Sequence, residues 1–199
     1  MARAILIWGV VGCAIAAPIF LATQSPYLAF RQPIYIAAGF AGILGLGLLL
    51  LQPLLAARLL PMSPVQSRQV HRWVGLLLLA AVLVHVGGLW IFSPPDVIDA
   101  LLLRSPTPFS VWGVLAMWAI FAATALALMR RRLGLPILVW RRAHTTLAAA
   151  TVVGTVVHAL LIEGTMEPIS KALLCAFALA ATLKALLDLR IWTSSNRAR

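Results

Sequence analysis

The sequence contains four histidines, and they form two pairs with the same spacing. His71 and His85 are fourteen residues apart, as are His144 and His158. In an α-helix, fourteen residues turn about 1400° and rise about 21 Å, so both imidazoles of a pair lie within about 40° of one face. Two such helices side by side would offer two imidazole pairs, one above the other. This arrangement suits bis-histidine ligation of two stacked haems, and therefore electron transfer across a membrane.

The composition indicates that the histidines lie in a membrane protein. Hydrophobic residues make up 62% of the chain and charged residues only 11%, whereas soluble domains average about 25% charged residues. Six apolar segments are long enough to cross a bilayer. We expect them at residues 4–22, 34–57, 70–92, 110–129, 143–162 and 169–189. The predicted fold is an all-α integral membrane protein, a bundle of six transmembrane helices in one domain over residues 1–199.

The first of these segments could be mistaken for a signal peptide. It starts after Arg3, but its apolar run continues past Cys13 to Ala22, which is long enough to span. We therefore expect it to be retained as the first membrane helix. Cys13 and Cys175 both lie in apolar segments and are expected to pack as small hydrophobic residues.

The net charge of +11 is distributed unevenly between the loops on the two sides of the predicted bundle. One side has twelve arginines: Arg3, Arg58, Arg68, Arg72, Arg130, Arg131, Arg132, Arg141, Arg142, Arg190, Arg197 and Arg199. The other side has Arg31, Arg104 and Lys171 with four acidic residues. By the positive-inside rule, both termini are predicted to be cytoplasmic. A nucleic-acid partner is not expected, because no basic patch is interleaved with aromatic residues outside the membrane edge.

This topology predicts which histidines meet. The third and fifth segments both start on the cytoplasmic side, so they run in the same direction. His71 should therefore pair with His144 around an inner haem, and His85 with His158 around an outer haem.

Several neighbours of the histidines are candidate cofactor contacts. Four arginines flank the inner pair and could bind haem propionates, although each could equally be a membrane-edge anchor: Arg68, Arg72, Arg141 and Arg142. Gly75 and Gly154 each lie one turn from a histidine, where the missing Cβ could admit a flat macrocycle or a neighbouring helix. The second segment contains Gly39, Gly42, Gly45 and Gly47, which we interpret as packing residues. The tryptophans near the segment ends, Trp140 among them, are expected to form an interface belt rather than an electron relay.

Two short segments resemble a known family. Residues 69–75 (Gln-Val-His-Arg-Trp-Val-Gly), followed by His85, resemble the third span of the ferric reductase-like transmembrane domain. Residues 140–144 (Trp-Arg-Arg-Ala-His), followed by His158, resemble its fifth span. The resemblance extends over about residues 34–190. It implies electron transfer through two b-type haems, from a cytoplasmic donor to an acceptor on the outer side.

The family includes NADPH oxidases, iron-chelate reductases and the haem-binding membrane subunit of the periplasmic methionine sulfoxide reductase system. The first two usually append a flavin and nicotinamide domain, but this sequence has no glycine-rich dinucleotide fingerprint in a soluble segment. We therefore expect a separate cytoplasmic flavoprotein reductase or a quinol as donor, with any flavin on that partner. The length is similar to that of the methionine sulfoxide reductase subunit, whereas the four-histidine set looks more like the iron reductases. The acceptor, a protein or a small molecule, stays open.

The resulting hypothesis is a haem-containing electron-transfer subunit of an oxidoreductase in the bacterial inner membrane, surrounded by lipid. No catalytic side chains are expected, because the sequence has no carboxylate pair, nucleophile–base pair or metal-hydrolase motif. A bis-histidine haem has no open axial position, so its expected role is outer-sphere electron transfer. Two alternatives remain at this point. One is a membrane transporter that moves protons or a metal by way of its histidines. The other is an assembly protein that binds haem without passing electrons.

Overall fold

The structure is a computed structural model, and it describes residues 1–189 of the chain. The described residues form eight α-helices and one short 3₁₀ helix. These are α1 (Ala2–Thr23), η1 (Pro26–Leu28), α2 (Pro33–Ala56), α3 (Pro64–Phe92), α4 (Pro94–Leu101), α5 (Pro108–Leu128), α6 (Arg130–Leu133), α7 (Ile137–Leu161) and α8 (Pro168–Leu189). Six of them, α1, α2, α3, α5, α7 and α8, are long and apolar enough to cross a membrane. The predicted all-α, six-span fold is confirmed.

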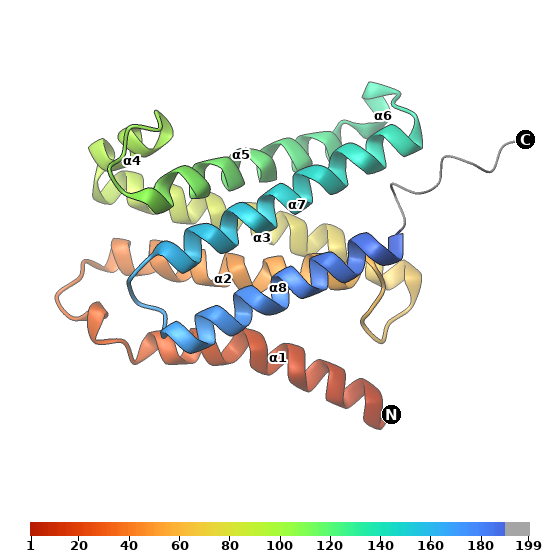
Figure 1. The fold of residues 1–199 in the computed structure, drawn as a ribbon, viewed down its shortest axis with the longest axis horizontal. Coiled ribbons are helices and arrows are strands. Elements are labelled where there is room, and N and C mark those ends of the chain that lie inside the picture. The colour runs from red at the N-terminus through yellow and green to blue at the C-terminus, as the bar shows by residue number, and fades with distance from the viewer. Residues whose placement is uncertain (190–199) are drawn as a thin grey trace, which may run out of the picture.

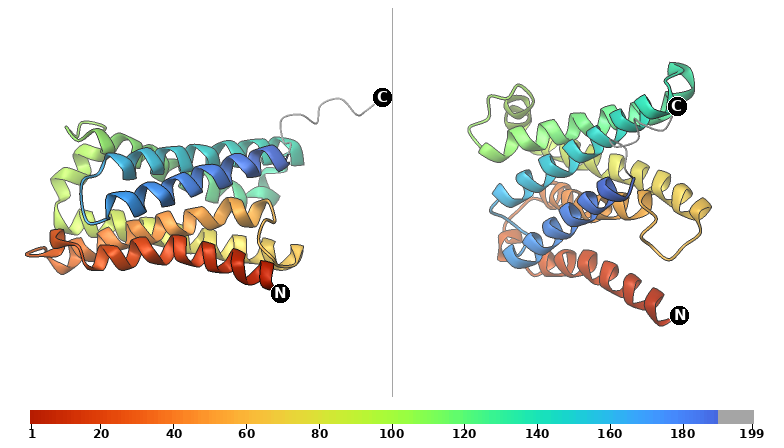
Figure 2. Two further views of the ribbon diagram at one scale, coloured as in Figure 1. Left: turned by 60° about the horizontal axis from the view of Figure 1, so that its bottom comes forward. Right: turned by 45° about the vertical axis from the view of Figure 1, so that its right-hand side comes forward.

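The long helices form a bundle in which consecutive membrane helices are antiparallel (Figures 1 and 2). α2 packs along α3, and α5 packs along α7. α8 packs against α2 and α7, while α1 lies at the outside of the bundle against α2 and α8. The start of α1 and the end of α8 lie at the same end of the bundle, as six crossings require.

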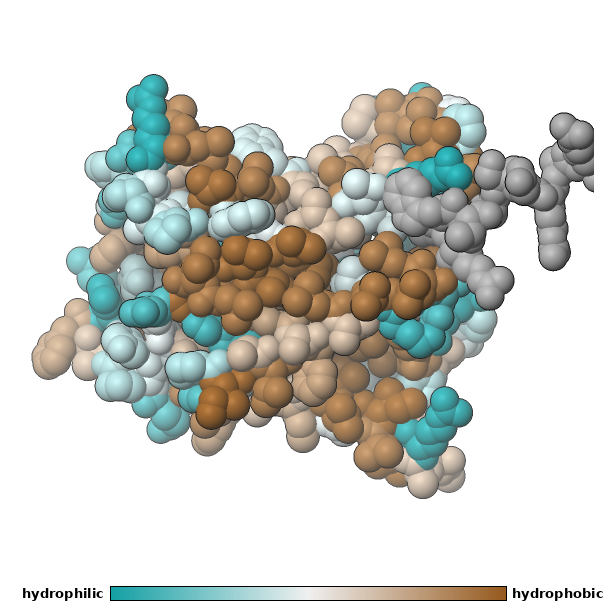
Figure 3. All heavy atoms as spheres, viewed as in Figure 1, coloured by the Kyte–Doolittle hydropathy of each residue, from teal (hydrophilic) through white to brown (hydrophobic). Residues whose placement is uncertain are grey.

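The surface is divided along the helix axes. Apolar side chains cover the middle of the molecule in Figure 3, and hydrophilic ones gather toward its two ends. Many large apolar side chains in the middle are exposed, which suits contact with lipid. We call the end that contains α6 and the α2–α3 loop the arginine-rich end, and the end that contains η1 and α4 the opposite end. That the arginine-rich end faces the cytoplasm stays a prediction.

Two membrane helices start earlier than expected. α3 begins at Pro64 rather than at residue 70, and α7 begins at Ile137 rather than at residue 143. In α3 a capping box explains the start: the Gln66 N–H donates to Ser63 Oγ, and the Ser63 N–H donates to Gln66 Oε1. The first turns of α3 contain Gln66, Ser67 and Arg68, so a search for apolar runs omits them. The first turn of α7 is apolar, but Arg141 and Arg142 follow it and separate it from the apolar run that was predicted to span. The predicted connector over residues 93–108 contains α4, which buries Val97.

α2 and α3 approach closely near the opposite end because α3 has a glycine there. A Cβ at Gly88 would lie 2.8 Å from the Ala38 Cβ and 3.5 Å from the Ile34 carbonyl oxygen. The adjacent Gly87 has nothing within 4 Å of its Cβ position. Gly88 therefore sets the distance between the two helices, whereas Gly87 does not.

We predict that Gly88→Val lowers the free energy of unfolding by about 1–3 kcal/mol, because the larger side chain forces α3 away from α2. The measurement is the melting temperature of the purified protein in detergent. Gly87→Val is the matched control and should melt close to the wild type. Equal losses in both variants would contradict the assigned role of Gly88.

α8 begins with a carboxylate cap outside the membrane span. Glu167 accepts the backbone N–H groups of Ile169 at 2.8 Å and Ser170 at 2.6 Å. These bonds favour the ionised form, so they lower the pKa of Glu167 below its ordinary value of 4.5.

A group with a lowered pKa in the folded state stabilises the fold above its unfolded-state pKa, and this stabilisation is lost as the pH falls through the folded-state pKa. We therefore expect part of the fall in melting temperature between about pH 6 and about pH 3.5 to disappear in Glu167→Ala. Glu163 is an exposed acid in the same loop, and Glu163→Ala should show the same fall in melting temperature as the wild type. Parallel pH profiles for wild type and Glu167→Ala would rule out the cap as a source of pH dependence.

Candidate functional site

His85 and His158 meet between α3 and α7 toward the opposite end. Their ring centroids are 6.4 Å apart, and the ring planes are inclined by 81°. The two side chains come from helices that start at the same end of the bundle. The structure therefore brings together the two histidines that were predicted to form the outer pair.

His71 and His144 lie toward the arginine-rich end on the same two helices. They are close enough to interact electrostatically. Each is separated from its outer counterpart by fourteen residues, which is about 21 Å along a helix. The four histidines thus lie at two levels of the bundle, with one from α3 and one from α7 at each level.

Each imidazole is directed at a backbone carbonyl of the helix packed beside its own. In α3, the Nδ1–H of His85 donates to the Ala38 oxygen at 2.7 Å, and that of His71 to the Gln52 oxygen at 3.3 Å. Both acceptors lie on α2, again fourteen residues apart. The spacing of the donors on α3 is therefore matched by the spacing of the acceptors on α2.

The same arrangement recurs in the second helix pair. The Nδ1–H of His158 in α7 donates to the Phe109 oxygen of α5 at 2.8 Å. His144 interacts with the Ala123 backbone, fourteen residues further along α5. Its buried Nδ1 does not reach hydrogen-bond geometry with any described residue. Three of the four rings are thus oriented by a hydrogen bond, and the fourth faces the corresponding position.

These bonds determine which ring nitrogen is free. A carbonyl oxygen can only accept, so Nδ1 is the protonated nitrogen in His71, His85 and His158. Nε2 then has its lone pair available for a metal, which is the usual state of a metal-bound histidine with an oriented ring. Each pair offers two nitrogen ligands. No group of three or more His, Cys, Asp or Glu side chains suited to a metal ion occurs in residues 1–189.

Two glycines beneath the outer rings were not predicted as site residues. A Cβ at Gly42 would lie 2.9 Å from His85 Nδ1, and a Cβ at Gly113 would lie 2.7 Å from His158 Nδ1. Each glycine follows the carbonyl acceptor by four residues, so the missing Cβ lets the imidazole reach a carbonyl inside a helix. Gly42 had been interpreted only as a packing residue. The sequence contains no local indication of this role, because it depends on which helices pack together.

Trp140 also lies closer to the site than expected. Its ring stacks on His144 with a centroid distance of 5.3 Å and an interplanar angle of 9°. Its indole N–H donates to the Leu126 oxygen, and the Arg130 guanidinium lies 4.6 Å from the centre of its ring. Trp140 therefore connects His144 to a surface arginine, in addition to its place near a membrane edge.

The remaining predicted contacts lie in different surroundings. Arg68, Arg72 and Arg141 are exposed and Arg142 is half-buried. A Cβ at Gly154 would lie 3.1 Å from both the Ala116 Cβ and the Trp112 oxygen, so this glycine allows α7 to pack closely on α5. Gly75 faces Gln52 on α2. As cofactor contacts, these six residues stay predictions.

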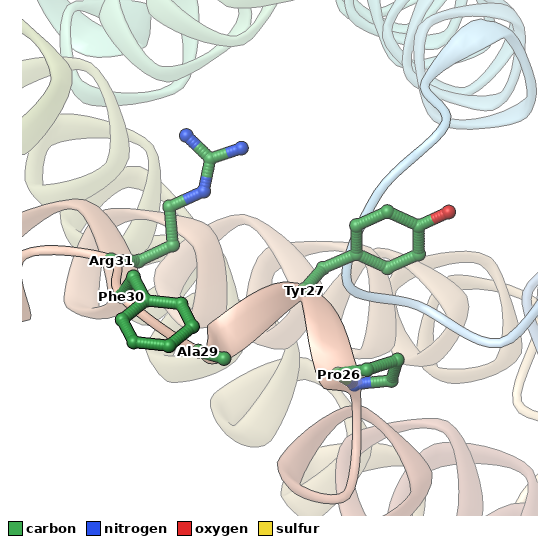
Figure 4. Close-up of a pocket in the computed structure, with 5 residues that line it drawn as sticks. All are labelled: Pro26, Tyr27, Ala29, Phe30 and Arg31. Carbon is green, nitrogen blue, oxygen red and sulfur yellow. The ribbon is translucent and has the colours of Figure 1, made fainter.

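A surface depression at the opposite end lies apart from the histidines. It is an open hollow in the α1–α2 loop, and Figure 4 shows the side chains around it. Pro26, Tyr27, Ala29, Phe30 and Arg31 line it. None of these is among the predicted site residues.

Comparison with known proteins identifies the family. The model of the family described as "Ferric reductase like transmembrane component" matches residues 41–155. The matched region includes three of the four histidines and both glycines beneath the outer rings, and His158 follows it by three residues. No curated protein and no solved structure matches the chain. The family match covers more than half of the chain, which therefore belongs to the ferric reductase-like transmembrane family, a family associated in general with transmembrane electron transfer.

Proposed function

We propose that this protein moves electrons across the membrane through two b-type haems, held one above the other by the histidines of α3 and α7. The observation that supports this most directly is the pairing of His85 with His158 at a centroid distance of 6.4 Å. Family membership gives independent support, because ferric reductase-like domains generally bind haem.

The distance between the outer rings fits two ligands on one metal ion. Two imidazoles that each placed a nitrogen about 2 Å from a shared metal ion could have their ring centroids about 6.3 Å apart. A haem would take two ligands from the protein, the number that each histidine pair offers. Bound in this way, it supplies one-electron oxidation and reduction.

For the inner haem, His71 and His144 are the proposed ligands. Trp140 stacks on His144 and limits the rotation of its ring. Nearby arginines are proposed to bind the haem propionates, since guanidinium groups pair well with carboxylates. The proposed propionate contacts are Arg68, Arg72, Arg141 and Arg142.

The electron donor is proposed to bind at the arginine-rich end, on the cytoplasmic side. α6 contributes three exposed arginines there, Arg130 to Arg132, next to the end of α5. A reduced flavin on a partner protein, or a quinol, loses two electrons and two protons there, with the electrons leaving one at a time. An acceptor protein or small molecule on the outer side gains one electron in each transfer. The proposed location is a bacterial inner membrane.

A reduced-minus-oxidised visible spectrum of the purified protein tests this proposal. We expect a b-type signal, and a haem content of two per chain. A transporter that used bare histidines would show no such signal. A haem-binding assembly protein would show it, but its haems would not be reduced by a cytoplasmic reductase and reoxidised by an outer acceptor.

Single histidine substitutions test the pairing. His85→Ala and His158→Ala should each remove the same spectral component, and His71→Ala and His144→Ala should each remove the other, because both members of a pair hold one haem. The measurement is the haem content and spectrum of each purified variant. A His71→Ala protein that still held two haems would show that the proposed inner pair is wrong.

The glycine beneath His85 gives a second test that leaves every histidine in place. Gly42→Val should strongly reduce the outer-haem component, because the new side chain occupies the position of the His85 ring. Gly39→Val is the matched control on the same helix, since nothing lies within 4 Å of its Cβ position. Normal haem content in Gly42→Val would show that the ring does not need the observed position.

A further inference from the structure

Among the described residues, one charged side chain is buried, that of Lys171. Only 9% of its surface is exposed, although it lies in the first turn of a membrane helix, α8. Its ammonium donates to the Ile162 oxygen at 2.6 Å, at the C-terminus of α7. A buried charge in a membrane helix is costly, so such a residue is a candidate for a functional role.

The surroundings of Lys171 favour its cationic form but do not neutralise it. The C-terminus of α7 is the negative end of that helix dipole. Glu167 uses its carboxylate on the backbone of α8, and Glu163 is exposed. In residues 1–189, the ion pair that the structure contains is Lys184–Asp188, toward the other end of α8. The charge of Lys171 therefore acts on its surroundings without a carboxylate in contact.

Lys171 is near the outer histidine pair. Its acceptor Ile162 follows His158 by four residues, which is one helical turn, or about 6 Å. The ammonium is therefore on the order of 10 Å from the outer pair and much further from the inner pair. At that range a buried charge is only weakly screened, whereas exposed arginines at the other end are screened by water and salt.

On the basis of the two-haem function proposed above, we infer that Lys171 raises the midpoint potential of the outer haem relative to the inner one. Reduction adds one electron at the outer site, and a fixed positive charge nearby stabilises the reduced form more than the oxidised form. The electron supplied by the cytoplasmic donor is thereby favoured at the outer site, from which the outer acceptor takes it. Lys171 touches no reacting atom, so it acts only through the electric field of its charge.

A redox titration followed by visible absorbance tests this inference. Lys171→Gln retains a hydrogen-bond donor for Ile162 and removes the charge. Lys171→Met removes both. We expect both variants to lower the midpoint potential of the haem that is lost in His158→Ala, with the other haem unchanged. Lys171→Arg should titrate like the wild type.

Lys184→Gln is the matched control, because Lys184 is on the same helix but exposed and paired with Asp188. It should leave both potentials unchanged. If a Lys171→Gln protein that holds both haems had the wild-type midpoint potentials, the inference would be overturned. Equal shifts in the midpoint potentials of both haems would also overturn it. Loss of the outer haem in both neutral variants, or loss of the protein in them but not in Lys171→Arg, would instead assign Lys171 to haem retention or to folding. A wild-type protein without a b-type spectrum would refute the proposed function itself.

Discussion

Three of the four candidate ligands in this protein are positioned by the same interaction, a hydrogen bond from an imidazole Nδ1–H to a backbone carbonyl of the adjacent helix. Such a bond contributes only about 0.5–1.5 kcal/mol net, but leaving a polar group unpaired in a lipid-surrounded bundle costs more. The bond at His85 or His158 therefore satisfies the ring in the membrane and also orients it. Since Nδ1 is used, Nε2 remains available as a ligand.

This interaction makes the supporting helices as important as those with the histidines. α2 and α5 contribute no reactive side chain, yet their carbonyls determine where the rings of α3 and α7 point. Antiparallel helices rise by the same distance per residue, so histidines fourteen residues apart need acceptors fourteen residues apart. The two hairpins, α2–α3 and α5–α7, meet this requirement in the same way. They can therefore be regarded as two copies of one structural solution.

The six spans and the meeting of His85 with His158 could be predicted from the sequence, because apolar content, charge and residue spacing can be read from single segments. The roles of Gly42 and Gly113 could not, since they depend on which helix faces which ring. The stacking of Trp140 on His144 depends on a four-residue spacing that is common in helices, so it is not diagnostic alone. The early start of α3 was missed because its first turns are polar, and that of α7 because two arginines, Arg141 and Arg142, interrupt its apolar run.

The two histidine levels are held differently, and the difference has a physical consequence. At the outer level both rings make short hydrogen bonds over glycines, so the backbone itself determines their positions. At the inner level the bond of His71 is longer, and His144 is held instead by the stacked ring of Trp140, which contacts Arg130 at the surface. The position of His144 therefore depends on side-chain packing that extends to the surface. The outer rings depend instead on how α2 packs along α3 and how α5 packs along α7.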